Sequence, residues 1–200
     1  MIIEGILTTL GDDGAANVAA MGVLLDPEHR AADGRWLGFR LRPFPGSRTY
    51  RNLQRRPAGV FHLTDDVLLL ARAALGDVAD IPLKQVAPAG CPALADCVRA
   101  FAFVVESADW SSSRANLNCR IEHVESRRDW IGWNRAQHAV LELTISATRV
   151  SMIERAVIEA QIETLTPLIE KTAGPNEFAA WRFVNDYLRR AWSDAESAAP

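Results

Sequence analysis

Apolar and polar residues alternate along the first two thirds of the chain with the period of two that is typical of β-strands. Residues 2–9 and 15–25 are rich in β-branched and small apolar side chains, and an Asp-Gly pair lies between them. An Asp-Gly turn flanked by two such runs predicts a β-hairpin. The remaining strands are expected at residues 35–42, 58–63, 97–107 and 114–124.

The strand expected at residues 35–42 has two chemically different faces. One face is apolar and is assigned to the core; it comprises Leu37, Phe39 and Leu41. The opposite face comprises Trp36, Gly38, Arg40 and Arg42. Two arginines side by side on an outer face either serve a ligand or point into water, and the pattern alone leaves both readings open.

Two short helices are expected between the strands. Ser47 is a suitable N-cap for a helix at residues 48–55, and Gly76 is expected to close a helix at residues 67–75. Residues 77–92 are rich in proline and glycine, so they are expected to form an irregular connection.

From Asn134 onward the apolar period changes from 2 to 3.6, which predicts three C-terminal helices. The capping-box pattern from Ser151 to Glu154 is expected to open the second of them, and Pro167 to kink or break it. Strands followed by helices favour an antiparallel, closed sheet with a helical annex, and therefore a mainly β protein with added α-structure. We divide the chain into residues 1–130 and 131–196, with the helical region packed on the barrel.

Composition narrows the class of protein. The 200-residue chain has a formal net charge of −3, which argues against a nucleic-acid partner. The cysteines lack paired spacing and are expected to be reduced thiols; they are Cys91, Cys97 and Cys119. The N-terminus has no basic segment of a signal peptide, and no apolar run reaches the roughly 20 residues of a membrane span. The chain is expected to be soluble and cytoplasmic.

The usual catalytic and metal-binding motifs are absent from the sequence. There is no GxGxxG, Walker A, GxSxG or HExxH pattern, and the histidines have no metal-ligand spacing with the cysteines. No metal site is expected, and no catalytic residue is assigned.

One segment has the chemistry of a phosphate site. A strand carrying Arg40 and Arg42 leads through a Pro/Gly turn into a helix start that carries Ser47 and Thr49. Guanidinium groups, hydroxyls and the free N–H groups of a helix start together suit a phosphate. A solvated surface strand with an ordinary helix cap remains the alternative.

A longer string that includes this helix start carries a family resemblance. The sequence SRTYRNLQRRPAGVFHLTDDVLLLARAAL, residues 47–75, resembles the middle of the FMN-binding split-barrel superfamily, in its flavin-reductase-like branch. Residues 8–23, 40–66 and 132–149 resemble, more narrowly, a domain-of-unknown-function family of archaeal and bacterial proteins.

The resemblance implies a six-stranded antiparallel split β-barrel that forms a homodimer and binds FMN at the subunit interface. It implies that the phosphate is held by Arg40, Arg42, Ser47 and Thr49. It places the isoalloxazine ring along the backbone of Ala20, Met21, Gly22 and Val23. Alternation along residues 114–124 adds two candidates from the non-core face, Asn118 and Arg120. Arg120 has Glu106 and Glu122 as alternative partners.

The resemblance supports an inference about the fold and the cofactor better than one about the reaction, because proteins of one fold catalyse several reactions. The basic substrate residues of pyridoxamine-phosphate oxidases are not found in this sequence. The leading hypothesis is an FMN-dependent oxidoreductase that acts on a small substrate or exchanges electrons with a nicotinamide. The alternatives are a non-catalytic FMN-binding or electron-carrier protein, and a barrel for another planar ligand such as a deazaflavin, a pterin or haem.

Overall fold

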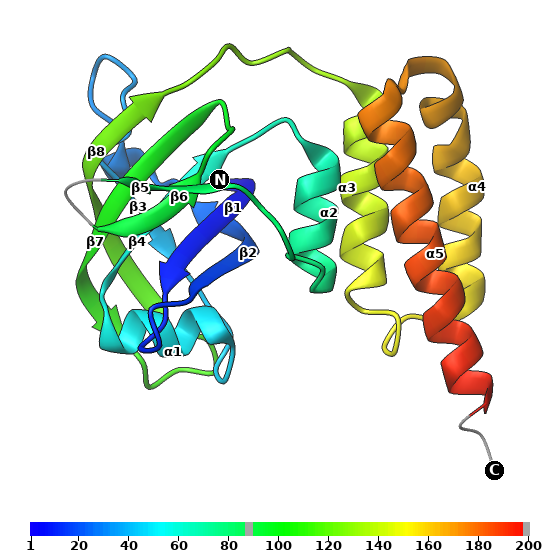
Figure 1. Ribbon diagram of the computed structural model, residues 1–200, viewed down its shortest axis with the longest axis horizontal. Helices are drawn as coiled ribbons and strands as arrows, with labels where there is room; N and C mark the ends of the chain where they lie inside the picture. Colours follow the sequence, from blue (N-terminus) through cyan, green and yellow to red (C-terminus); the bar gives the residue numbers. More distant parts are fainter. Residues whose placement is uncertain (87–89, 198–200) are drawn as a thin grey trace. The chain divides into compact units, whose positions relative to one another are not determined.

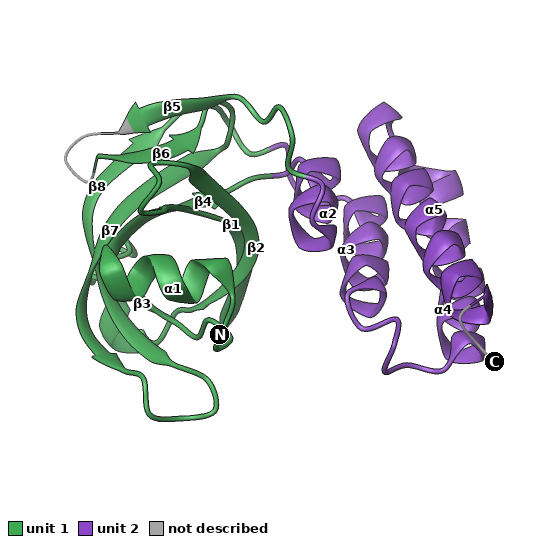
Figure 2. Ribbon diagram, turned by 60° about the horizontal axis from the view of Figure 1, so that its bottom comes forward, with its two compact units in different colours: residues 1–64, 78–130 green, residues 65–77, 131–200 purple. Residues whose placement is uncertain are grey.

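The computed structural model describes residues 1–86 and 90–197, which form two compact units. The first, here called the barrel unit, comprises Met1–Thr64 and Val78–Trp130 (Figure 2). The second, here called the helical unit, comprises Asp65–Asp77 and the chain from Ile131 onward.

Six antiparallel strands close the barrel, which confirms the fold expected from the sequence (Figure 1). They are β1 (Ile2–Leu10), β2 (Ala16–Leu24), β3 (Gly38–Leu41), β4 (Ala58–Leu63), β7 (Arg99–Asp109) and β8 (Asn116–Ser126). Their order around the barrel is β1-β2-β3-β8-β7-β4. Helix α1 (Arg48–Arg55) connects β3 to β4, and a short 3-10 helix, η1 (Pro27–His29), follows β2.

Aromatic side chains fill the barrel. Phe39 packs against Phe61 and Phe103, with ring centroids 5.6 and 5.1 Å apart, and all three are fully buried. Since β3 begins only at Gly38, the face assignment of the two preceding residues was wrong. The indole of Trp36 stacks on Phe101, with centroids 4.9 Å apart, while Leu37 is 48% exposed. The larger apolar surface of the indole explains why Trp36, and not Leu37, packs against the core.

A small hairpin lies where an irregular connection was expected. Strand β5 (Leu83–Val86) pairs antiparallel with β6 (Cys91–Leu94), which corrects that prediction for the described residues; residues 87–89 of the expected connection lie outside them. In a two-stranded ribbon each strand has one unpaired edge, so Pro92 is tolerated although it has no N–H to donate.

The helical unit contains four helices: α2 (Val67–Leu75), α3 (Arg135–Ala147), α4 (Arg155–Thr172) and α5 (Pro175–Ser197). Val67 and Ala71 of α2 pack in one apolar cluster with residues of the other three, among them Val140 and Val184. The division drawn from the sequence had placed residues 67–75 with the barrel. Packing between segments distant in the chain places α2 with the C-terminal helices.

The helix ends follow the local signals only in part. Asn134 caps α3, since its Oδ1 accepts hydrogen bonds from the N–H groups of Ala136 and Gln137. The capping box expected from Ser151 is wrong, because α4 begins at Arg155 with Glu154 as an N-cap that makes no side-chain bond. Helix α4 also continues through Pro167 without a break. None of the described helices combines the length and apolar character needed to cross a lipid bilayer.

Candidate functional site

The outer face of strands β3 and β8 brings two predicted site residues together. Arg40 pairs with Leu24 of β2 on one side and with Asn118 of β8 on the other. The neighbours of Arg40 in β3, Phe39 and Leu41, are buried in the barrel. Because side chains alternate between faces, Arg40 and Asn118 lie next to each other on the outside of the barrel.

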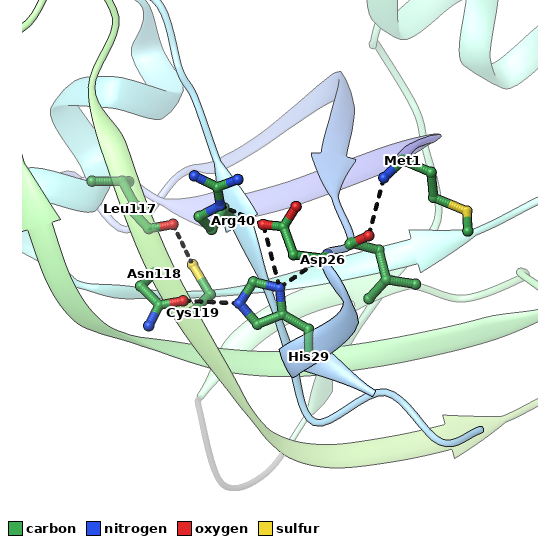
Figure 3. A network of polar contacts seen from close by, with 8 residues as sticks. Met1, Asp26, His29, Arg40, Leu117, Asn118 and Cys119 are labelled. Atoms are coloured by element: carbon green, nitrogen blue, oxygen red, sulfur yellow. Dashed lines mark hydrogen bonds and ion pairs between the residues drawn. The ribbon is translucent and has the colours of Figure 1, made fainter. Parts of the chain in front are cut away.

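A polar network joins these two side chains (Figure 3). Nε of Arg40 donates to Oδ2 of Asp26 at 2.6 Å, and the pKa of the Asp26 carboxyl is lowered chiefly by this bond. The backbone N–H of Asp26 donates to Nδ1 of His29 at 3.2 Å, and Nε2 of His29 lies 3.0 Å from Oδ1 of Asn118. Sequence reasoning missed Asp26 and His29; the turn-forming Asp26-Pro27 pair was the only local signal.

The hydrogen bonds of the network indicate the tautomer of His29 and the orientation of the Asn118 amide. Nδ1 of His29 accepts a hydrogen bond and therefore carries no proton, so the ring proton resides on Nε2. Nε2–H donates to Oδ1 of Asn118, which leaves both amide protons of Asn118 for another acceptor.

The turn from β3 to α1 offers a free cation beside a helix start. Arg42 directly follows β3 and is exposed; among the described residues its guanidinium has no hydrogen-bond or ion-pair partner. Gly46, at φ 78°, lets the chain turn towards α1, and Oγ of Ser47 caps that helix by accepting from the N–H of Tyr50 at 3.1 Å. The first N–H groups of an α-helix attract anions, so this turn suits a phosphate.

Thr49 has different surroundings from those expected. Its side chain is 3% exposed, and its Oγ1 accepts from Nδ2 of Asn17 at 3.0 Å. Asn17 and Asn52 both donate to Oγ1 of Thr9, so four buried polar side chains form one network. Thr49 therefore ties α1 to β1 and β2, and its hydroxyl does not face solvent.

The predicted ring-binding segment lies in the last part of β2. Met21 and Val23 pack with the barrel core, which leaves Ala20 and Gly22 on the opposite face. A Cβ atom at Gly22 would lie 2.8 Å from the Ile2 side chain and 3.1 Å from the Glu4 carboxylate. The side chains of Ile2 and Glu4 thus occupy the space over Gly22, where a larger residue would clash with them.

Arg120 takes part in a surface ion network. Its guanidinium contacts the carboxylates of Glu106 and Glu122, each at 2.5 Å, and the side chain is 52% exposed. The alternative that the sequence left open, pairing with these acids, is therefore present. Arg120 and Asn118 also line a pocket of about 680 Å³ that extends away from Arg40 along β8.

The cysteines are buried, and two of the three potential metal ligands near η1 are already bonded. Asp26, Glu28 and His29 bring potential metal-ligand atoms within 4.8 Å of one another, but Asp26 and both ring nitrogens of His29 already make hydrogen bonds. All the cysteines are free and buried, and burial raises the pKa of each thiol. A reactive thiolate is not available in this arrangement.

The closed six-stranded antiparallel barrel has the split-barrel fold. The chain belongs to the DUF447 family, described as proteins of unknown function: the N-terminal domain of the family matches residues 3–128, and a second domain matches residues 134–186. No curated protein matches the sequence.

Solved structures resemble this chain in fold. An FMN-bound DUF447 protein from Methanosarcina mazei is 19% identical, with a TM-score of 0.76, over 93% of this chain and 94% of that one. The homolog of nitrilotriacetate monooxygenase component B from Mycobacterium thermoresistibile is 12% identical, with a TM-score of 0.51, over 64% and 70%. The styrene monooxygenase flavin reductase from Pseudomonas putida S12 is 13% identical, with a TM-score of 0.51, over 63% and 79%.

Proposed function

We propose that this chain is a cytoplasmic FMN-binding flavoprotein whose cofactor lies on the outer face of β2 and β3. The observation that carries the proposal is the exposed guanidinium of Arg42, which has no partner among residues 1–86 and 90–197, beside the capped start of α1. Arg42, Ser47 and the first N–H groups of α1 would hold the phosphate. The FMN bound by the Methanosarcina mazei relative supports this choice of ligand.

The ring of FMN would lie along the backbone of residues 20–23, as the resemblance implies. Asp26 holds Nε of Arg40, so the two terminal nitrogens of Arg40 remain for the cofactor. Bound flavin supplies the redox chemistry, and the protein positions it and excludes water. Thr49 is no longer a phosphate ligand in this proposal; it fixes α1 so that Ser47 and the helix start keep their place.

The proposed reaction is electron transfer between the flavin and a small organic substrate or a nicotinamide donor. The described residues offer no activated thiolate, so a reaction carried by the flavin fits the site better than one carried by a cysteine nucleophile. Loss of the visible flavin absorption on addition of NADH or NADPH supports an oxidoreductase. Flavin that stays oxidised with every donor supports the alternative of a non-catalytic FMN-binding or electron-carrier protein.

Replacing Arg42 with alanine is expected to weaken FMN binding by about 1.5–3 kcal/mol, the usual contribution of a hydrogen bond to a charged group. Riboflavin has no phosphate, so its affinity is expected to be nearly the same in the wild type and the variant. Titration of flavin-free protein, followed by flavin fluorescence, measures both affinities. Arg55→Ala is the matched control, because Arg55 is exposed and bound to Asp12. Equal FMN affinity in wild type and Arg42→Ala would refute the assignment.

The proposed functional form is a homodimer. Small barrels fill their interiors with side chains, as the buried phenylalanines do here, so a flavin ring has to bind outside. Ligand sites usually bury about 70% or more of the ligand. A second copy of the chain related by a two-fold axis would cover both flavins at once.

Sedimentation velocity of the FMN-loaded protein is expected to show a dimer of twice the 22.0 kDa chain mass at low micromolar concentration. The flavin absorption should sediment with the dimer, because each site uses both chains. A monomer that keeps its flavin during sedimentation contradicts the proposal.

A further inference from the structure

The pocket beside Asn118 is separate from the proposed phosphate and ring positions. It lies along β8 and the segment before β3, and its volume of about 680 Å³ is within the usual range for small-ligand sites. The side chains used below are His29, Trp36, Leu37, Asn118 and Val124. Arg42, Ser47 and the outer face of β2 do not contribute to its walls.

On one side of the pocket, the side-chain amide of Asn118 is a hydrogen-bond donor with a fixed orientation. His29 is 8% exposed, and its Nε2–H holds Oδ1 of Asn118 at 3.0 Å. The Asn118 amide therefore cannot rotate to exchange its oxygen and nitrogen without losing this bond. Its N–H groups have no partner among the described residues, so the pocket presents a donor to an acceptor atom such as a carbonyl oxygen.

Another wall is aromatic and held in place. The indole of Trp36 stacks on Phe101 at an interplanar angle of 12°, which fixes the plane of the ring. Leu37 and Val124 add exposed apolar surface, at 48% and 43% exposure. A flat, largely apolar ligand would cover this surface.

The charged side chains that line the pocket disfavour an anionic ligand. Its two arginines, Arg35 and Arg120, already contact the carboxylates of Asp33, Glu106 and Glu122. Glu28 adds another carboxylate to the lining. Because both arginines are paired with acids, an anion entering the pocket would meet carboxylates and no unpaired arginine.

We propose that this pocket binds an uncharged planar ring compound through a carbonyl oxygen that accepts a hydrogen bond from Asn118. Asn118 lies opposite Arg40 in the sheet, so the pocket adjoins the proposed cofactor face. Its use as the substrate site of the flavin reaction rests on the proposed function. Binding of the ring compound itself requires no flavin, so it is tested independently.

The test uses chromone, an uncharged planar bicyclic ketone, and chromone-2-carboxylate, which adds one negative charge to the same ring. Each is titrated into flavin-free, ¹⁵N-labelled protein while the Asn118 side-chain amide and the Trp36 indole N–H are followed by NMR. Chromone is expected to shift both signals, and chromone-2-carboxylate to bind about tenfold more weakly. Absence of shifts at both groups, or equal affinity for the two compounds, overturns the proposal.

Two substitutions locate the ligand. Asn118→Asp keeps the side-chain shape and the acceptor for His29 but removes the amide donors, so chromone affinity, followed at Trp36, should fall about tenfold. Val124→Arg places a bulky cation at an exposed position of the pocket and should also weaken chromone binding. Val157→Arg is the control, because Val157 is an exposed valine, at 57%, of the helical unit. Unchanged affinity in both pocket variants overturns the proposal.

A second titration with the FMN-loaded protein separates this pocket from the flavin site. Chromone is expected to bind with the same affinity in the presence and absence of FMN. Competition between chromone and FMN would mean that the pocket holds the flavin ring, which contradicts a separate site. Failure of the chain to bind FMN would refute the proposed function only, since the titration of the flavin-free protein still tests the pocket.

Discussion

Replacing Phe39 with alanine is expected to lower the free energy of unfolding of the barrel unit by about 3–5 kcal/mol, the usual cost of truncating a buried phenylalanine. Phe39 is fully buried, and its ring lies within 5.6 Å of Phe61 and 5.1 Å of Phe103, measured between centroids. The variant loses the apolar burial of the ring and leaves a cavity that a closed barrel cannot collapse to fill. Urea denaturation followed by near-ultraviolet circular dichroism measures the loss.

Phe39 also lies next to residues of the candidate site. Phe39 lies between Gly38, which lines the pocket, and Arg40, which faces the proposed cofactor. The matched control is Phe178→Ala in the helical unit, where the ring is 42% exposed and less burial is lost. A Phe39→Ala barrel that loses less than about 1 kcal/mol would show that the aromatic cluster does not have the packing role assigned to it.

The elements that the sequence predicted best are those with strong local signals. Helix α1 has the expected bounds because Ser47 caps it, and α2 ends where Gly76 adopts φ 87°, a conformation that favours glycine. The hairpin of β1 and β2 formed around its Asp-Gly turn. Each of these signals acts within a few residues, so one sequence was enough to detect it.

The wrong expectations share a dependence on partners far away in the chain. Trp36 turns towards Phe101, which is 65 positions further along the chain and had no detectable relation to it in the sequence pattern. Helix α2 belongs to the helical unit because Val67 and Ala71 meet residues of the C-terminal helices. Periodicity identifies an apolar stripe, but it does not identify the surface that covers it.

In the candidate site, too, local patterns were predicted correctly and contacts between residues distant in the chain were not. Alternation correctly placed Arg40 and Asn118 on outer faces, and the sheet register then made them neighbours. Thr49 of helix α1 matched a phosphate pattern, yet Asn17 of strand β2 donates a hydrogen bond to its hydroxyl. His29, which sets the orientation of Asn118 across 89 positions of sequence, had no motif that could have identified it.

Lowering the pH from 6.5 to 4 is expected to cost the barrel unit about 3 kcal/mol of stability through His62 alone. His62 is fully buried, and burial lowers its pKa from 6.5 to about 4. Its Nδ1–H donates to the carbonyl of Ile6 at 3.0 Å, and Nε2 accepts from the N–H of Leu94 at 3.1 Å. The folded barrel therefore holds the ring neutral. The unfolded chain takes up a proton below pH 6.5, so stability falls as the pH falls through this window.

Urea denaturation of the wild type and of His62→Gln across this pH range isolates the contribution of the histidine. The variant cannot protonate at this position, so its stability is expected to fall by about 3 kcal/mol less than that of the wild type over the same range.

Glu125, whose pKa is lowered to about 2 by hydrogen bonds from Arg127 and Lys84, also loses stabilisation in acid, starting near its ordinary pKa of 4.5. Both proteins retain Glu125, so its effect cancels in the difference. Parallel curves for the wild type and His62→Gln would show that the imidazole gains its proton inside the folded barrel, and that its burial does not couple folding to pH.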